Sequence, residues 1–152
     1  MRAVFGLLVL ACFGAFILTQ RLKHTPTAVQ SFELTPVFSP TPTGSLKQER
    51  ISFKLASADE VTVAIVDSDD KDVALLVRDL PTPRYKQLSL RWNGRTGGSG
   101  RYTRLESADG HRSLLGDDRG SLAPAGSYSV RVTLRRQHRT VTSPRTFRLA
   151  RG

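Results

Sequence analysis

The sequence predicts an all-β domain, an antiparallel β-sandwich of about seven short strands, that follows one N-terminal transmembrane helix. Three observations support this prediction. Apolar and polar residues alternate in several segments after residue 46, turn-forming residues separate these segments, and the first twenty residues contain an uncharged apolar run. Alternation with a period of two is typical of strands that bury one face. Short strands at regular spacing favour a sandwich.

The N-terminal segment, residues 1–20, is predicted to be a membrane anchor. The run Ala3–Leu18 (AVFGLLVLACFGAFIL) carries no charge, and as a helix it would extend about 24 Å, at the short end for a membrane span. A cleaved signal peptide needs small residues before its cut site, and Phe16–Gln20 does not offer them. Lipidation at Cys12 would leave an apolar tail on the mature protein. A retained signal-anchor is favoured, with secretion after cleavage as the alternative.

The charges that flank the anchor leave its orientation nearly balanced. Arg2 precedes the apolar run, and Arg21 and Lys23 follow it. The very short N-terminal tail favours a signal-anchor whose N-terminus stays inside. We therefore expect a single-pass protein of the cell membrane whose C-terminal domain is extracytoplasmic.

Residues 21–34 are predicted to be a Thr/Pro-rich stalk, and residues 35–150 the sandwich. Prolines at positions 26, 36, 40 and 42 exclude a helix of useful length between the anchor and the domain. Apolar residues near this boundary could dock onto the domain as a first edge strand, where proline is tolerated. These residues are Phe32, Leu34, Val37 and Phe38.

Further strands are expected at 51–55, 61–65, 73–77, 88–92, 127–135 and 140–149. Pro81 and Pro83 are expected to break the chain, and Pro144 to mark the last strand as an edge or bulged strand. The polar segment 101–121 is ambiguous, but 102–105 could pair with 111–115 as a small hairpin.

The alternation also predicts which side chains are buried. Arg131, Thr133 and Arg135 should face water, because they alternate with an apolar row in the strand at 127–135. The shared core should consist of Phe53, Val63, Ile65, Leu90, Trp92, Tyr128, Val130, Val132, Leu134 and Phe147.

An ordered set of motifs gives the chain a resemblance to a known family. Phe38–Pro40 is followed by the I-x-F-x-L strand Ile51–Leu55, then by Val61–Asp67, by the WNGR motif Trp92–Arg95 and by the turn and strand start Ala123–Tyr128. This order resembles the FlgD-type bacterial Ig-like domain over roughly residues 35–149. The resemblance implies an Ig-like fold, no catalytic residues and a structural, cell-surface or assembly role.

One segment departs from the family pattern. The family usually has a short connection between the W-[DN]-G motif and the following Pro/Gly turn. Here residues 101–121 form an insertion in that connection. We expect a feature particular to this protein to lie there.

Charge is distributed unevenly along the chain, whose formal net charge is +10. Residues 47–80 contain 5 Lys or Arg and 8 Asp or Glu, whereas residues 81–152 contain 15 and 4. Such asymmetry suggests an anionic partner, although scattered arginines can also serve solubility. The candidate surface for an anionic partner is Arg131, Arg135, Arg136 and Arg139.

Metal and phosphate motifs are absent from the sequence. The acidic turn Asp67–Asp72 fails the EF-hand pattern, since Lys71 and Arg78 take positions that require oxygen ligands. The glycine cluster 97–100 lacks the Lys and the following helix of a phosphate-binding loop. We therefore expect no metal site and no cofactor.

Catalytic and nucleic-acid-binding patterns are absent as well. His24, His111 and His138 lie far apart in the sequence, and no G-x-S-x-G elbow is present. No aromatic residues interleave with the basic cluster 135–139, as single-stranded nucleic acid would require. We expect no catalytic residues and no nucleic-acid partner.

Together these features predict a non-enzymatic, membrane-anchored extracytoplasmic Ig-like module. Its expected role is protein interaction, surface assembly or structural spacing, with the membrane and other envelope proteins as partners. The alternative is a binding module for an anionic cell-envelope polymer, which it would hold through the basic C-terminal half.

Overall fold

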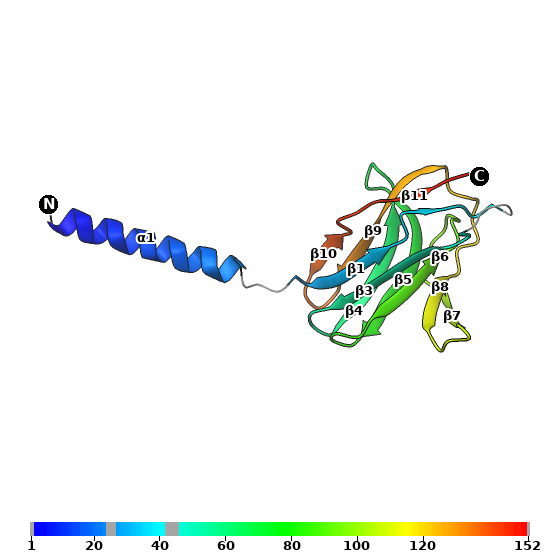
Figure 1. Ribbon diagram of the computed structural model, residues 1–152, viewed down its shortest axis with the longest axis horizontal. Coiled ribbons are helices and arrows are strands. Elements are labelled where there is room, and N and C mark those ends of the chain that lie inside the picture. Colours follow the sequence, from blue (N-terminus) through cyan, green and yellow to red (C-terminus); the bar gives the residue numbers. More distant parts are fainter. Residues whose placement is uncertain (1, 24–26, 42–45, 152) are drawn as a thin grey trace.

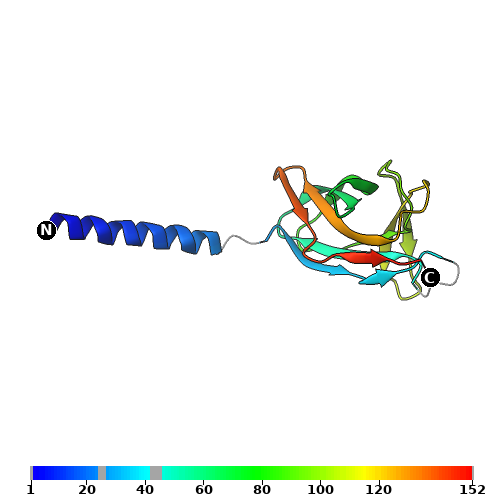
Figure 2. The same cartoon turned by 90° about the horizontal axis from the view of Figure 1, so that it is seen from above.

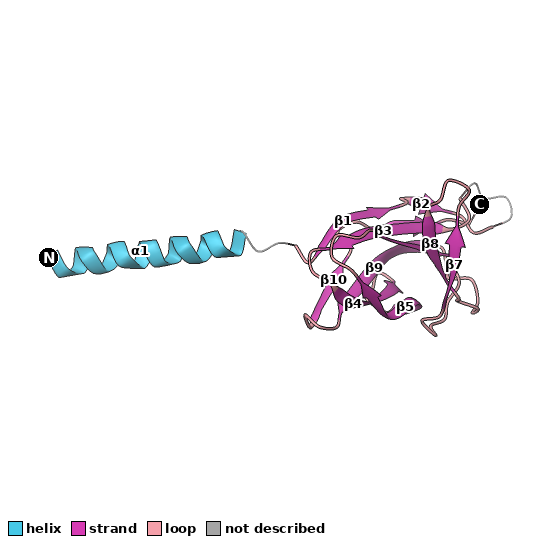
Figure 3. Cartoon of the chain, turned by 90° about the horizontal axis from the view of Figure 1, so that it is seen from below, coloured by secondary structure: helices cyan, strands magenta, loops and turns pink. Residues whose placement is uncertain are grey.

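The computed structural model describes residues 2–23, 27–41 and 46–151 (Figure 1). Helix α1 (Arg2–Lys23) lies apart from two β-sheets that hold all the strands of the described residues (Figures 1 and 3). Seen from above, the two sheets pack as layers of a sandwich (Figure 2). The prediction of a mainly β, two-sheet domain is confirmed.

The first sheet has five strands in the order β1-β3-β6-β8-β7. All neighbours in it are antiparallel except β6 and β8, which run parallel. Its strands are β1 (Val29–Leu34), β3 (Glu49–Leu55), β6 (Leu88–Trp92), β7 (Tyr102–Glu106) and β8 (Arg112–Gly116).

The second sheet has six strands, five of them in the order β2-β11-β9-β4-β5, with β10 also paired to β9. Strands β2 and β11 are parallel and the other pairs are antiparallel. The strands are β2 (Val37–Phe38), β4 (Asp59–Val66), β5 (Asp72–Thr82), β9 (Gly126–Leu134), β10 (Arg139–Thr142) and β11 (Phe147–Leu149).

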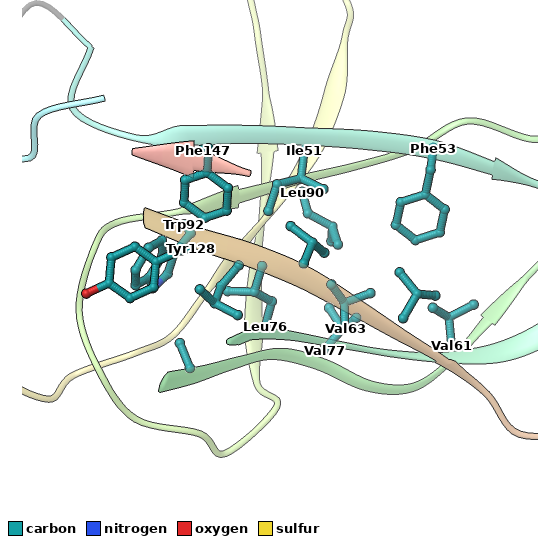
Figure 4. Close-up of a cluster of buried hydrophobic side chains, with 14 of the residues drawn as sticks. Ile51, Phe53, Val61, Val63, Leu76, Val77, Leu90, Trp92, Tyr128 and Phe147 are labelled. Carbon is teal, nitrogen blue, oxygen red and sulfur yellow. The ribbon is translucent and has the colours of Figure 1, made fainter. Parts of the chain in front are cut away.

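The core lies between the two sheets and contains every residue that the alternation predicted. Figure 4 shows the side chains of β3 and β6 pointing toward those of β4, β5 and β9. Each of the ten predicted core residues is at most 4% exposed. Alternate residues turn inward along each strand, so burying these rows excludes water from the whole space between the sheets.

Trp92 is the centre of the aromatic part of this core. Its ring centroid lies 5.6 Å from that of Phe38, 5.5 Å from that of Tyr128 and 6.0 Å from that of Phe147. The indole Nε1 donates a hydrogen bond to the backbone oxygen of Arg95 at 2.9 Å. Trp92 thus joins β6 of the first sheet to β2, β9 and β11 of the second with its polar atom satisfied.

The boundaries predicted for the stalk, residues 21–34, are wrong. The helix continues to Lys23, and Val29–Leu34 forms the edge strand β1, paired with β3. The side chain of Phe32 stacks on Phe53 with a centroid distance of 5.4 Å. The edge strand expected at Phe32 and Leu34 is therefore confirmed, and the domain begins at β1 rather than at residue 35. Residues 24–26 lie outside the described residues.

The expected chain break at Pro81 and Pro83 is also corrected. Strand β5 continues through Pro81, which lies opposite Glu60 of β4, and ends at Thr82. Because β5 is at the edge of its sheet, the missing N–H of proline removes no hydrogen bond to a further strand.

The number of strands exceeds the predicted seven for identifiable reasons. The return strand expected at 140–149 is divided into β10 and β11 around Pro144, and both parts pair with β9. The segment 101–121 forms the hairpin β7–β8, with Leu105 opposite Ser113. This hairpin confirms the suggested pairing and extends the first sheet beyond β6.

Helix α1 has 22 residues. Within the described residues, no helix meets the combined requirements of length and hydropathy for a membrane span.

Replacement of Trp92 tests how much the aromatic cluster contributes to the fold. Because Trp92 is 0% exposed, we expect Trp92→Ala to lower the free energy of unfolding by about 3–5 kcal/mol. The measurement is chemical denaturation of the detergent-solubilised full chain, followed by circular dichroism. Leu46→Ala, at a position 43% exposed, is the control and should change it by less than about 0.5 kcal/mol. Equal effects of the two substitutions would contradict the assigned core.

Candidate functional site

The predicted anionic-partner surface is partly neutralised by acidic residues of neighbouring strands. Arg131 on β9 forms an ion pair with Asp72 at the start of β5. Arg135 lies 3.0 Å from Glu60 Oε2 and 3.7 Å from Asp79 Oδ2. Two of the four candidate arginines therefore have carboxylate partners within the domain, which weakens their attraction for an external anion.

The tip of the β9–β10 hairpin, which carries the other two arginines, is held by Asp59. The backbone N–H of Arg136 donates to Asp59 Oδ1 at 2.8 Å, and that of Gln137 donates to Asp59 Oδ2 at 3.2 Å. Burial alone would raise the pKa of Asp59, but these bonds and one from the N–H of Glu60 hold that pKa below its ordinary value. Arg136 and Arg139 are exposed, and no carboxylate of the described residues lies within ion-pair distance of them.

A more concave basic surface lies on the first sheet, where the hairpin β7–β8 joins β6. Strands β6 and β8 run parallel and form only two residue pairs, Leu90 with Leu114 and Arg91 with Leu115. Two hollows of about 310 and 580 Å³ lie beside the beginnings of these strands. Both are lined by Gln87, Ser89, Arg112 and Ser113. We call the two hollows together the β6–β8 crevice.

A row of polar side chains, three of them serines, crosses the outer face of the sheet beneath the crevice. Glu33 of β1 lies opposite Ser52 of β3, which lies opposite Ser89 of β6. Ser113 precedes Leu114 on β8 as Ser89 precedes Leu90 on β6, so it continues the row. Because the serine side chains in this row are short, the floor of the crevice lies close to the backbone of the sheet.

Cationic side chains stand around that floor. Arg50 and Arg91 lie opposite each other on β3 and β6 and line the smaller hollow. Lys86 and Arg104 line the larger one, and Arg112 lines both. Among the described residues, Arg112 is the only one of these cations that forms an ion pair. Its partner is Glu106, at 4.0 Å, and both side chains are exposed.

Ser113 lines the crevice with a hydroxyl that is itself buried. The residue is 8% exposed, and its Oγ has no hydrogen-bond partner among the described residues. A buried hydroxyl without a partner costs about 1–3 kcal/mol. Ser89, which is half-buried and lines both hollows, is the serine whose hydroxyl a ligand can reach.

Two further acids, Glu49 and Asp118, are buried although no sequence motif marks them. Glu49 Oε1 accepts a bond from the backbone N–H of Thr35 at 2.8 Å, while Oε2 has no partner in the described residues. Burial raises the pKa of Glu49 to about 8, and burial together with the charge of Asp117 raises the pKa of Asp118 to about 7. Glu49 begins the inward row of β3, two residues before Ile51, a position that could have identified it from the sequence.

The acidic turn that invited a calcium interpretation uses its first carboxylate internally. Asp67 Oδ1 accepts hydrogen bonds from the backbone N–H groups of Asp69 at 2.9 Å and Lys71 at 3.0 Å. Across residues 2–23, 27–41 and 46–151, no three His, Cys, Asp or Glu side chains are grouped so as to hold a metal ion.

Comparison of the chain with protein-family models, with curated proteins and with solved structures returns no match. The likeness to FlgD-type Ig-like domains therefore stays a prediction that depends on the motifs quoted above.

The buried carboxyl of Glu49 predicts a specific pH dependence of stability. Its pKa is about 8 in the folded protein and near its ordinary value of 4.5 in the unfolded chain, so the folded state holds this proton more tightly. The contribution of Glu49 to stability is complete below pH 4.5 and is lost as the pH rises toward about 8.

Comparison with Glu49→Gln isolates this contribution, because Asp118 and other titrating groups are common to both proteins. The free energy of unfolding of the wild type, minus that of the variant, should fall as the pH is raised from 4.5 to 8. Denaturant titrations at several pH values measure it. A difference that is constant or rises over this range would contradict the burial of Glu49.

Proposed function

We propose that this protein is a non-enzymatic, membrane-anchored module whose Ig-like domain is displayed outside the cytoplasm for protein interaction, surface assembly or structural spacing. The observation that carries the proposal is the exposure of large apolar side chains on α1. Val4, Leu7, Leu10 and Phe13 are 70%, 73%, 74% and 63% exposed.

The arrangement of these side chains supports lipid as their environment. At about 100° per residue, the exposed apolar positions 4, 7, 8, 9, 10 and 13 are spread around the helix with no gap wider than about 100°. A surface helix of a water-soluble domain would have one apolar stripe and an opposite polar face. Each of these side chains would gain about 1.5–3 kcal/mol on removal from water, and α1 lies away from the sheets that could cover it (Figure 2).

The length of α1 is also compatible with an anchor. A helix of 22 residues extends about 33 Å, comparable with the roughly 30 Å hydrocarbon core of a bilayer. The apolar run within it is shorter, so the bilayer would thin slightly around the helix or its ends would lie in the headgroup region.

Local contacts of the family-like motifs support the Ig-like assignment. In the WNGR motif, Asn93 Oδ1 accepts the backbone N–H of Arg95 at 3.0 Å, and Asn93 Nδ2 donates to the backbone oxygen of Asp118 at 3.2 Å. The hydroxyl of Tyr128 donates to the backbone oxygen of Pro124 in the turn that precedes β9. Such contacts give structural roles to the residues that carry the resemblance.

The non-enzymatic part of the proposal draws on the positions of the two perturbed acids. Perturbed pKa values in a cleft indicate catalytic groups, but Glu49 and Asp118 are not among the residues that line the β6–β8 crevice. Their burial fits a structural role.

Fractionation of cells that express the full chain tests the anchor. We expect the protein to sediment with membranes, to resist extraction by salt or alkali, and to be released by detergent, because α1 is held by lipid. The double variant Leu7→Arg/Leu10→Arg should shift it to the soluble fraction, since each central arginine costs about 2.5–3.5 kcal/mol.

Leu46→Arg, at an exposed position of the domain, is the matched control and should leave membrane association unchanged. Protease added to intact cells should digest the domain if it is extracytoplasmic. Recovery of the wild type in the soluble fraction, or protection of the domain in intact cells, would overturn the anchor or its orientation, respectively.

A further inference from the structure

We propose that the β6–β8 crevice binds a segment of an acidic polysaccharide. Its cations would hold the acid groups of the polymer, and its serine hydroxyls would bond to the hydroxyls of the sugar units. This inference rests on the proposed function in one respect: a domain outside the cytoplasm would meet such a polymer in the cell envelope.

Charge complementarity supports an anionic ligand at this place. The two hollows are lined by Arg50, Arg91, Arg104, Arg112 and Lys86, against the carboxylates of Glu33 and Glu106. Arg50 and Arg91 are cross-strand neighbours, and like charges directly opposite each other repel. An anion placed between the two guanidinium groups would relieve this repulsion and could accept paired N–H bonds from each.

The hydroxyl groups of the crevice favour a sugar polymer among possible anions. Ser52, Ser89 and Ser113 lie on three adjacent strands, which are spaced about 4.8 Å apart, a separation comparable with the length of one sugar unit along a chain. Ser89 is half-buried and lines both hollows, so its hydroxyl can bond a ligand hydroxyl or acid oxygen in the crevice.

The lining disfavours one other ligand class. Among the described residues, no Phe, Tyr or Trp lines either hollow, so the crevice lacks the stacking surfaces on which proteins bind single-stranded nucleic acid. A polymer held by charge and hydroxyl groups along the open face of the sheet fits this observation.

Binding of polygalacturonate to the full chain in detergent micelles tests the proposal, with neutral dextran and poly-L-glutamate as comparison probes. We expect binding of polygalacturonate that weakens with added salt, no binding of dextran, and weaker binding of poly-L-glutamate. The triple variant Arg50→Gln/Arg91→Gln/Arg112→Gln should reduce the affinity for polygalacturonate about tenfold or more.

A control with the same change of charge separates this site from general attraction to a basic protein. Arg145→Gln/Arg148→Gln/Arg151→Gln removes three exposed arginines outside the crevice and should alter the affinity less than about twofold. Ser89→Ala, which removes only a hydroxyl that lines both hollows, should weaken binding several-fold with an unchanged melting temperature. It keeps the test decisive if the triple crevice variant does not fold.

Several results would overturn the proposal. They are absence of polygalacturonate binding, equal losses in the two triple variants, full binding by Ser89→Ala, and binding of poly-L-glutamate as tight as that of polygalacturonate. The last result would assign the crevice to acidic protein segments. Membrane fractionation uses none of these probes, so failure here leaves the anchor proposal unaffected.

Discussion

Burial of two facing sets of inward side chains is the constraint on which the rest of this structure depends. Strands β4 and β9 occupy the interior of the second sheet, and β3 and β6 pack over them from the first. Because side chains alternate along a strand, each apolar row can be covered only by another sheet. Trp92 reinforces the closure, since its ring contacts aromatic residues of three strands in the opposite sheet.

This closure leaves the edges and outer faces of the sheets as the places where function can reside. The first sheet gains an extra hairpin beyond β6, and the limited parallel pairing of β6 with β8 opens the crevice beside their first residues. Changes in Arg50, Arg91 or Ser113 alter that surface without removing an apolar residue from the core. The anchor helix is likewise separate, so tethering, folding and recognition depend on different residues.

The strands that could be predicted are those in which apolar and polar residues alternate within a short segment. The rows that end at Leu55, Ile65, Trp92 and Leu134 were identified because strand alternation is visible within a few residues. The apolar residues Phe32 and Leu34 suggested the edge strand β1, but the linker-like composition placed the domain boundary after it, and only pairing with β3 shows where the domain begins.

The candidate site was less predictable because its residues come from segments far apart in the sequence. The clustered arginines near the C-terminus suggested a binding surface. Their acidic partners Asp72 and Glu60 lie in strands much earlier in the chain, so the sequence did not reveal these ion pairs. The crevice depends on the register between β6 and β8, which brings Ser113 into line with Ser89. That register is set by tertiary packing and leaves no signal in either segment alone.

Native-state hydrogen exchange of the detergent-solubilised full chain tests the closed sandwich most directly. The account predicts that the backbone amides of Val63, Val130 and Val132, in interior strands of the second sheet, exchange only through global unfolding, while those of the edge strand β7 exchange faster. Exchange of the Val130 and Val132 amides at the rate of those in β7 would contradict the central claim that these rows are sealed between the two sheets.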